Sequence, residues 1–127
     1  MRIFKPLDIA SPAGALLIAL ALSQNVGAHA FPMQADPRVG ATIANSPSHV
    51  RIWFDGQLEP AFSAIAVYNS AKQQVDKGNG HVNSADATIL EVDLPNLVPG
   101  TYRVYWKALA KDTHVTEGDF SFAIEKK

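Results

Sequence analysis

Hydrophobic and polar residues alternate along much of this chain with the two-residue period of β-strands. The segment 88–94 shows this alternation clearly. Either Leu90, Val92 and Leu94 or the residues between them are expected to form its buried face. The segment 101–110 alternates in the same way, with one side rich in apolar residues and the other carrying its Lys and Arg. Each segment is therefore expected to be a strand with one face in a core and the other in water.

Shorter runs rich in β-branched and aromatic residues predict further strands, because Gly, Pro, Asn and Asp separate them. No segment has the periodicity of a convincing helix. About seven short strands without helices are typical of an all-β fold, and we predict an Ig-like Greek-key β-sandwich or barrel. The further strands are an edge strand at 30–33, strands at 50–54 and 63–69, weak strands near 74–76 and 81–83, and a last strand at 120–124.

Two local features refine this fold. Tyr102 follows Pro99 and Gly100 at the start of a late strand, as in the tyrosine corner of Ig-like sandwiches, where the tyrosine hydroxyl bonds to upstream backbone. In the connection between the strands at 50–54 and 63–69, Leu58 and Phe62 are expected to turn inward.

The first 28 residues have the features of an export signal peptide. Arg2 and Lys5 supply positive charge, and the apolar run at 13–22 is too short to span a bilayer. Cleavage after Ala28 would release a domain, 29–127, that begins with His29. Cleavage after Ala30 fits the preference for small residues at least as well and would release Phe31, so the signal rules leave both positions open.

The composition narrows the possible partners. Residues 29–127 carry nine Lys and Arg against eleven Asp and Glu, and no basic patch argues for nucleic acid. The chain has no cysteine, so it has no disulfide and no thiolate metal site. Met33 is the one methionine after residue 28, and a site for Cu(I), which prefers thiolate and thioether ligands, is therefore not expected.

A histidine at the amino terminus is a chelating group. Its free α-amino group, with a pKa of about 7.7–8, lies beside the Nδ1 atom of its own imidazole. Such a pair of nitrogen donors suits Cu(II), which favours tetragonal nitrogen and oxygen ligands. We therefore regard His29 as a candidate Cu(II) ligand.

A second candidate group lies in the segment 111–118, which is expected to be the loop between the last two long strands. Asp112 and His114 are two residues apart, so in an extended segment their side chains point the same way. An N-terminal strand running alongside would bring His29 to them. Taken alone, an Asp-x-His pattern is more often structural, because either residue can cap a turn. His49 and His81 are expected to face solvent.

These residues resemble the CopC family of periplasmic copper-resistance proteins, and the likeness covers nearly all of 29–127. No single matching segment is specific for the family, but the order of the segments along the chain is. The matching segments are 29–30, 37–41, 46–47, 59–63, 99–106 and 112–122.

The resemblance implies a small Ig-like β-sandwich or barrel in the periplasm that binds one Cu(II) per chain through His29, Asp112 and His114. Some members place a glutamate after a Phe-Ser that ends the early strand, whereas this chain has Phe54-Asp55-Gly56, so Asp55 is a candidate substitute as fourth ligand or neighbouring carboxylate. Members that hold Cu(I) carry methionines in a central loop, and the segment 72–86 has none. The family often works beside an inner-membrane copper transporter, CopD.

Two other functions are compatible with the sequence. A histidine-led copper site also occurs in oxidative polysaccharide-cleaving enzymes, although 99 residues leave little room for a substrate surface. A metal-free Ig-like interaction module would result if cleavage after Ala30 discarded His29. We favour a copper-binding protein that is not an enzyme.

Overall fold

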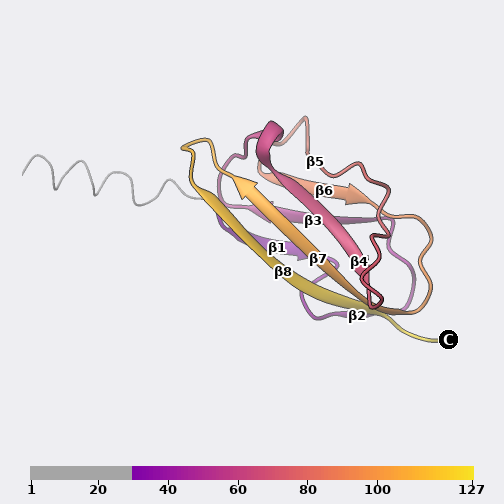
Figure 1. The fold of residues 1–127 in the computed structure, drawn as a ribbon. Helices are drawn as coiled ribbons and strands as arrows, with labels where there is room; N and C mark the ends of the chain where they lie inside the picture. The colour runs from indigo at the N-terminus through magenta and orange to yellow at the C-terminus, as the bar shows by residue number, and fades with distance from the viewer. Residues whose placement is uncertain (1–29) are drawn as a thin grey trace, which may run out of the picture.

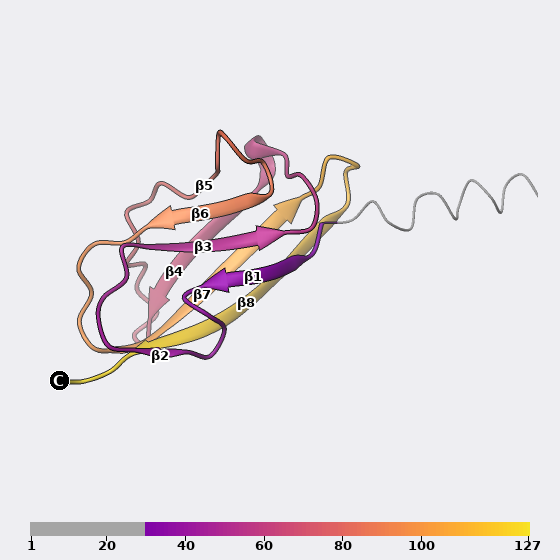
Figure 2. The same cartoon turned by 180° about the vertical axis from the view of Figure 1, so that it is seen from behind.

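Two four-stranded β-sheets pack face to face in the computed structural model, which describes residues 30–127 (Figures 1 and 2). The expected signal peptide at 1–28 and His29 lie outside these residues. Within them, no helix has the length and apolar character needed to cross a membrane. The strands are β1 (Pro32–Asp36), β2 (Thr42–Ile43), β3 (His49–Phe54), β4 (Ala64–Asn69), β5 (His81–Val82), β6 (Ile89–Asp93), β7 (Gly100–Leu109) and β8 (Val115–Ile124), and a 3-10 helix, η1, spans Pro60–Phe62.

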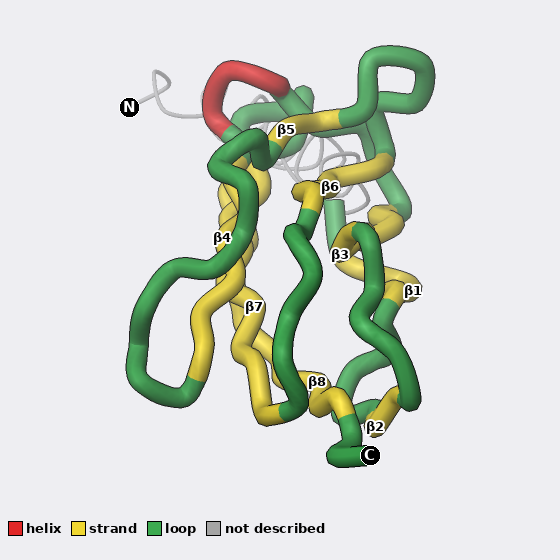
Figure 3. Tube along the Cα trace, turned by 90° about the vertical axis from the view of Figure 1, so that its right-hand side faces the viewer, coloured by secondary structure: helices red, strands yellow, loops and turns green. Residues whose placement is uncertain are grey.

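The strand order is β1-β3-β6-β5 in the first sheet and β2-β8-β7-β4 in the second. All pairs are antiparallel except β2 with β8, which are parallel. The chain changes sheet after β1, β2, β3, β4 and β6, so both sheets are built from distant parts of the sequence (Figure 3). This arrangement confirms the predicted all-β sandwich.

The core lies between the sheets and follows the alternation of the sequence. Of the two possible buried sets in 88–94, the structure buries Leu90, Val92 and Leu94, which are at most 4% exposed. The rings of Phe54 in the first sheet and Trp106 in the second meet edge to face, with centroids 5.3 Å apart. Such a contact between sheets adds to the free energy gained by burying the two rings.

The tyrosine corner is present. The Tyr102 hydroxyl donates a hydrogen bond to the Val98 carbonyl oxygen at 2.5 Å, and its ring stacks on Phe122 with centroids 5.6 Å apart. A buried hydroxyl needs such a partner, because leaving it unpaired would cost the free energy of its desolvation. The prediction from the residues around Pro99 is therefore confirmed.

Several boundaries differ from the prediction. β2 was not expected, because two residues carry no alternation. The segment 74–76 is not a strand, and Gln74 only forms an isolated bridge with Tyr68. β8 begins at Val115, so the loop expected at 111–118 is much shorter. Phe62 is 68% exposed, and its predicted inward turn is wrong.

The reason for the exposure of Phe62 is the way η1 is held. The Glu59 backbone N–H donates to the Leu109 carbonyl oxygen at 2.8 Å, and the Leu109 N–H donates to Ser63 Oγ at 3.1 Å. Ser63, on the inner side, is buried. No residue of η1 is buried, so Phe62 lies on the exposed side of this short helix.

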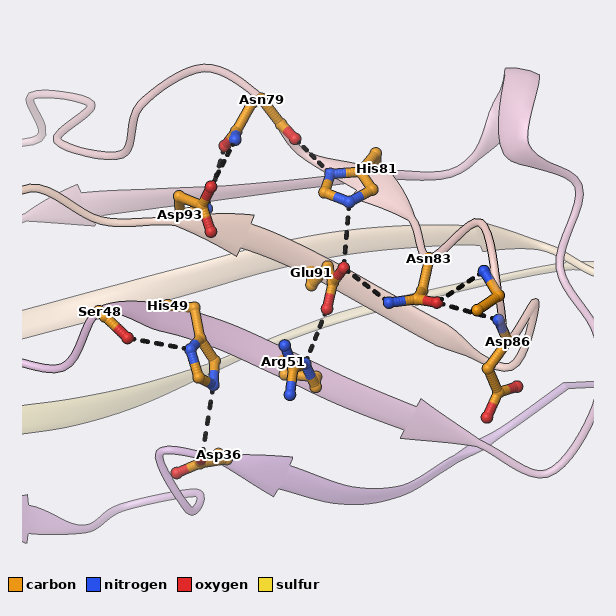
Figure 4. Close-up of polar contacts among 11 residues, drawn as sticks. Asp36, Ser48, His49, Arg51, Asn79, His81, Asn83, Asp86, Glu91 and Asp93 are labelled. Carbon is orange, nitrogen blue, oxygen red and sulfur yellow. Dashed lines mark hydrogen bonds and ion pairs between the residues drawn. The ribbon is translucent and has the colours of Figure 1, made fainter.

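A polar network covers the outer face of the first sheet (Figure 4). Glu91 Oε1 accepts a hydrogen bond from Arg51 Nε at 2.7 Å, and Glu91 Oε2 lies 3.0 Å from both Asn83 Nδ2 and His81 Nε2. Burial alone would raise the pKa of Glu91, but hydrogen bonds from Arg51 and Asn83 and the charges of Arg51 and His81 lower it below its ordinary value of 4.5. The charged carboxylate is therefore the form that the fold favours.

We expect Glu91→Gln to lower the free energy of unfolding at pH 7 by about 1–2 kcal/mol, because Arg51 and His81 lose a charged acceptor. A carboxylate with a lowered folded-state pKa stabilises the fold above its unfolded pKa, and this contribution is lost as the pH falls through the folded-state pKa. The difference between the two proteins in urea denaturation should therefore shrink below a pH of about 4. A constant difference down to pH 3, or an equal effect of Glu125→Gln at an exposed position, would contradict this account.

Candidate metal site

The turn between β7 and β8 carries two of the three predicted ligands. The Thr113 N–H donates to the Ala110 carbonyl oxygen at 2.9 Å, and the Ala110 N–H donates to the His114 carbonyl oxygen at the same distance. Thr113 has a φ of 77°, in the left-handed region that a β-branched residue rarely adopts. The segment is therefore a tight turn and not the extended loop that the sequence suggested.

Asp112 and His114 are in contact. Asp112 Oδ2 lies 2.7 Å from His114 Nδ1, and Asp112 Oδ1 accepts the His114 backbone N–H at 3.1 Å. The His114 side chain is about half exposed. The predicted meeting of these two side chains is therefore observed, although the left-handed Thr113, and not the alternation of a strand, brings them together.

The spacing of this pair is compatible with a shared metal ion. Imidazole nitrogens and carboxylate oxygens bind divalent ions such as Zn²⁺ at about 2.0–2.2 Å, so two ligands at right angles around one ion lie about 3 Å apart. Asp112 Oδ2 and His114 Nδ1 form a hydrogen bond of 2.7 Å, a separation close to that value, and a shared ion would replace the proton between them. Two ligands do not make a site by themselves, and within residues 30–127 no three His, Cys, Asp or Glu side chains gather closely enough to hold an ion.

The third predicted ligand, His29, lies outside the described residues, but the residue after it does not. Ala30 is 1% exposed and belongs to the hydrophobic core. Its carbonyl oxygen accepts a hydrogen bond from Thr116 Oγ1 at 2.9 Å, and Thr116 follows His114 by two residues on β8. The described chain therefore begins beside the β7–β8 turn (Figures 1 and 2).

Asp55 contacts the next residue of the same segment. Its Oδ1 accepts the Phe31 backbone N–H at 2.7 Å, and its own backbone N–H donates to the Phe31 carbonyl oxygen at 2.9 Å. From the sequence, Asp55 was expected only as a ligand or a neighbour of the metal. Thr116 was not expected at all, because its contact with Ala30 joins residues 86 apart and has no local signal in the sequence.

Of the other two histidines, His81 belongs to the polar network on the first sheet, and His49 lies on the same sheet in a separate group of contacts (Figure 4). His81 Nδ1 is 2.6 Å from the Asn79 carbonyl oxygen, and its Nε2 is paired with Glu91. His49 Nε2 is 3.6 Å from Asp36 Oδ2, and its ring is 29% exposed. The structure therefore places both histidines beside carboxylates of the first sheet.

Comparison with known proteins gives a consistent result. The CopC domain matches residues 33–125. The copper transport protein CutJ of Bacillus subtilis is 31% identical over 112 residues, which are 87% of this chain but only 21% of CutJ, so the chain spans about a fifth of that relative's length. Copper resistance protein C of Xanthomonas campestris pv. juglandis is 28% identical, over 87% of this chain and 91% of that protein.

Solved structures show the same fold. The crystal structure of CopC from Methylosinus trichosporium OB3b superposes with a TM-score of 0.67 and 32% identity, covering 76% of this chain and 94% of that one. PcoC, a methionine-rich copper resistance protein from Escherichia coli, superposes with a TM-score of 0.68 over 77% of this chain and 100% of that one. At 24% identity, the likeness to PcoC concerns the fold alone.

The left-handed conformation of Thr113 generates a prediction for the turn itself. Thr113→Gly should be more stable than Thr113→Ala by about 1 kcal/mol, because both lose the hydroxyl group but only glycine removes the steric conflict of a Cβ at positive φ. Urea denaturation of the two variants measures the difference. Equal stability, or a more stable alanine variant, would show that the turn is not strained.

Proposed function

Because this chain belongs to the CopC family, we propose that it is a periplasmic protein that binds one Cu(II) per chain, buffers or delivers the copper, and catalyses no reaction. The names of its relatives, a copper transport protein and a copper resistance protein, support a role connected with copper. The proposed ligands are His29, through its amine and imidazole, Asp112 and His114.

The observation that carries the proposal is the position of the Asp112–His114 pair. A carboxylate and an imidazole 2.7 Å apart lie on the turn that precedes Thr116, and Thr116 holds the Ala30 carbonyl oxygen. Consecutive Cα atoms are about 3.8 Å apart, so the Cα atom of the residue before Ala30 can lie only a short distance from the Ala30 contact with this strand. Two nitrogen donors of an amino-terminal histidine would complete a set of nitrogen and oxygen ligands suited to Cu(II).

The burial of Ala30 favours one of the two cleavage positions. Cleavage after Ala30 would remove a residue that is 1% exposed and part of the core, together with the acceptor of the Thr116 hydroxyl group. Cleavage after Ala28 keeps both and makes His29 the first residue. A domain 29–127 that follows a signal peptide 1–28 is therefore the arrangement that we propose.

The partner that we propose is a CopD-like inner-membrane copper transporter. In the copper transport protein CutJ, the region similar to this chain is only about a fifth of the molecule. A domain similar to this chain is thus part of a much larger copper transport protein in that organism, which supports a copper transporter as the partner of this domain.

Adding one glycine before His29 should weaken Cu(II) binding by at least tenfold without changing the fold, because the former amine becomes an amide nitrogen and the new terminal amine lies one residue further from the Asp112–His114 turn. Competition with a chelator of known affinity measures the binding, and circular dichroism checks the fold. Unchanged affinity in the extended protein would refute the role of the amine.

Asp112→Ala and His114→Ala should each change the electron paramagnetic resonance spectrum of the bound Cu(II), since each removes an atom directly attached to the ion. His81→Ala provides the matched control, because His81 contacts Asn79 and Glu91 on the first sheet. A spectrum that is insensitive to the first two substitutions but changes with the third would move the site to the polar network.

A further inference from the structure

We infer that Asp55 and Thr116 are positioning residues that hold Ala30 and Phe31 in one register, so that the first residue of the exported chain reaches the Asp112–His114 turn. This inference rests on the proposed function for its effect on copper. The contacts of Asp55 and Thr116 with residues 30–31, which we call the hold, are a property of the copper-free fold and can be tested separately.

Asp55 forms two hydrogen bonds with the backbone of Phe31. One carboxylate oxygen accepts the Phe31 N–H at 2.7 Å, while the Asp55 backbone N–H donates to the Phe31 carbonyl oxygen at 2.9 Å. Asp55 directly follows Phe54, the residue of β3 that pairs with Pro32 of β1. The side chain therefore extends the β1–β3 pairing by one residue beyond the last strand position, toward the chain terminus.

Thr116 holds the preceding residue from the other sheet. Its hydroxyl group donates to the Ala30 carbonyl oxygen at 2.9 Å, and Thr116 itself is fixed opposite Ala108 in the β7–β8 pairing. The start of the chain is thus bound to β3 by Asp55 and to β8 by Thr116. Because His114 lies two residues before Thr116, the same contact ties the start of the chain to a proposed ligand.

The side chain of Ala30 fixes the register. It is 1% exposed within the core, so only a small residue fits there. A slip of one residue would bring the ring of Phe31 or the imidazole of His29 to a place filled by one methyl group, and such overpacking costs free energy. The three contacts together leave one position for the start of the chain.

This arrangement assigns Asp55 a different role from that of a copper ligand. A ligand acts through its charge and its lone pairs on the ion, whereas the observed contact requires only an acceptor for the Phe31 N–H. Asp55→Asn retains an acceptor oxygen and removes the charge, while Asp55→Ala removes both. The two variants therefore separate the roles.

The experiment compares Asp55→Ala, Asp55→Asn and Thr116→Val with two controls. Asp76→Ala removes a carboxylate that accepts the Val67 backbone N–H at 2.7 Å on β4, the same kind of contact at a distant place. Ser63→Ala removes a hydroxyl group that donates to the Glu59 carbonyl oxygen at 2.9 Å and accepts from Leu109, near the same end of the sandwich. Both controls reproduce a loss of stability without contacting residues 30–31.

Two readouts are needed, and the first uses no copper. Hydrogen exchange of the Phe31 amide in the copper-free protein should be accelerated at least tenfold in Asp55→Ala and should change little in both controls. The Cu(II) dissociation constant, measured by chelator competition, should rise about 10–100-fold in Asp55→Ala and Thr116→Val, as for other residues that orient metal ligands. Asp55→Asn should stay close to the unchanged protein in both readouts.

A double-mutant comparison shows whether Asp55 acts through the first residue. In the protein with a glycine added before His29, the amine is already lost, so Asp55→Ala should cost much less Cu(II) affinity than it does in the unchanged protein. Equal losses in both proteins would overturn the inference.

Two other outcomes would also overturn it. One is unchanged exchange of the Phe31 amide in Asp55→Ala. The other is an Asp55→Asn variant that loses as much affinity as Asp55→Ala and has an altered Cu(II) resonance spectrum, which would make Asp55 a ligand. If the unchanged protein binds no Cu(II), the proposed function fails, and the exchange experiment still decides whether the hold exists.

Discussion

The pairing of β7 with β8 is the constraint on which the rest of the molecule depends. It runs from Gly100 opposite Ile124 to Leu109 opposite Val115, with the inner residues of both strands in the core. Because the register is fixed over the whole hairpin, the turn that closes it has a fixed place at one end of the sandwich. The Asp112–His114 contact and the Thr116 hydroxyl group are consequences of that register.

The same end of the molecule receives the start of the described chain. Ala30 packs in the core, its carbonyl oxygen is held by Thr116, and Phe31 is held by Asp55. Metal sites are commonly shared between distant parts of a chain, since their ligands become close only when the protein folds. In this protein the proposed site would join the first residue of the exported domain to the last hairpin, so that its formation would depend on export, cleavage and folding.

Much of the fold could be predicted from the sequence, because a sandwich with one buried face per strand leaves a two-residue period. Leu90, Val92 and Leu94, and the tyrosine corner at Tyr102, are examples. Short elements such as β2 carry no period. The outward position of Phe62 depends on hydrogen bonds between Leu109, which is far away in the sequence, and the two residues that flank η1, Glu59 and Ser63.

The candidate site was predictable only in part. Asp112 and His114 were identified by their spacing, but their contact depends on the left-handed Thr113, which no propensity of threonine suggests. The partners of Ala30 and Phe31 come from β8 and from the residue after β3, and sequence patterns do not encode such long-range hydrogen bonds. Asp55 was noticed for its charge, whereas the structure shows a contact with backbone.

In the proposed site, the exported chain begins with a histidine, and this residue binds copper together with the last hairpin. The most direct measurement is the intact mass of the protein recovered from the periplasm of copper-grown cells, taken under conditions that keep metals bound. We expect a chain that begins at His29 and carries one copper ion. A chain that begins at Phe31, or one that begins at His29 and carries no copper, would contradict the account.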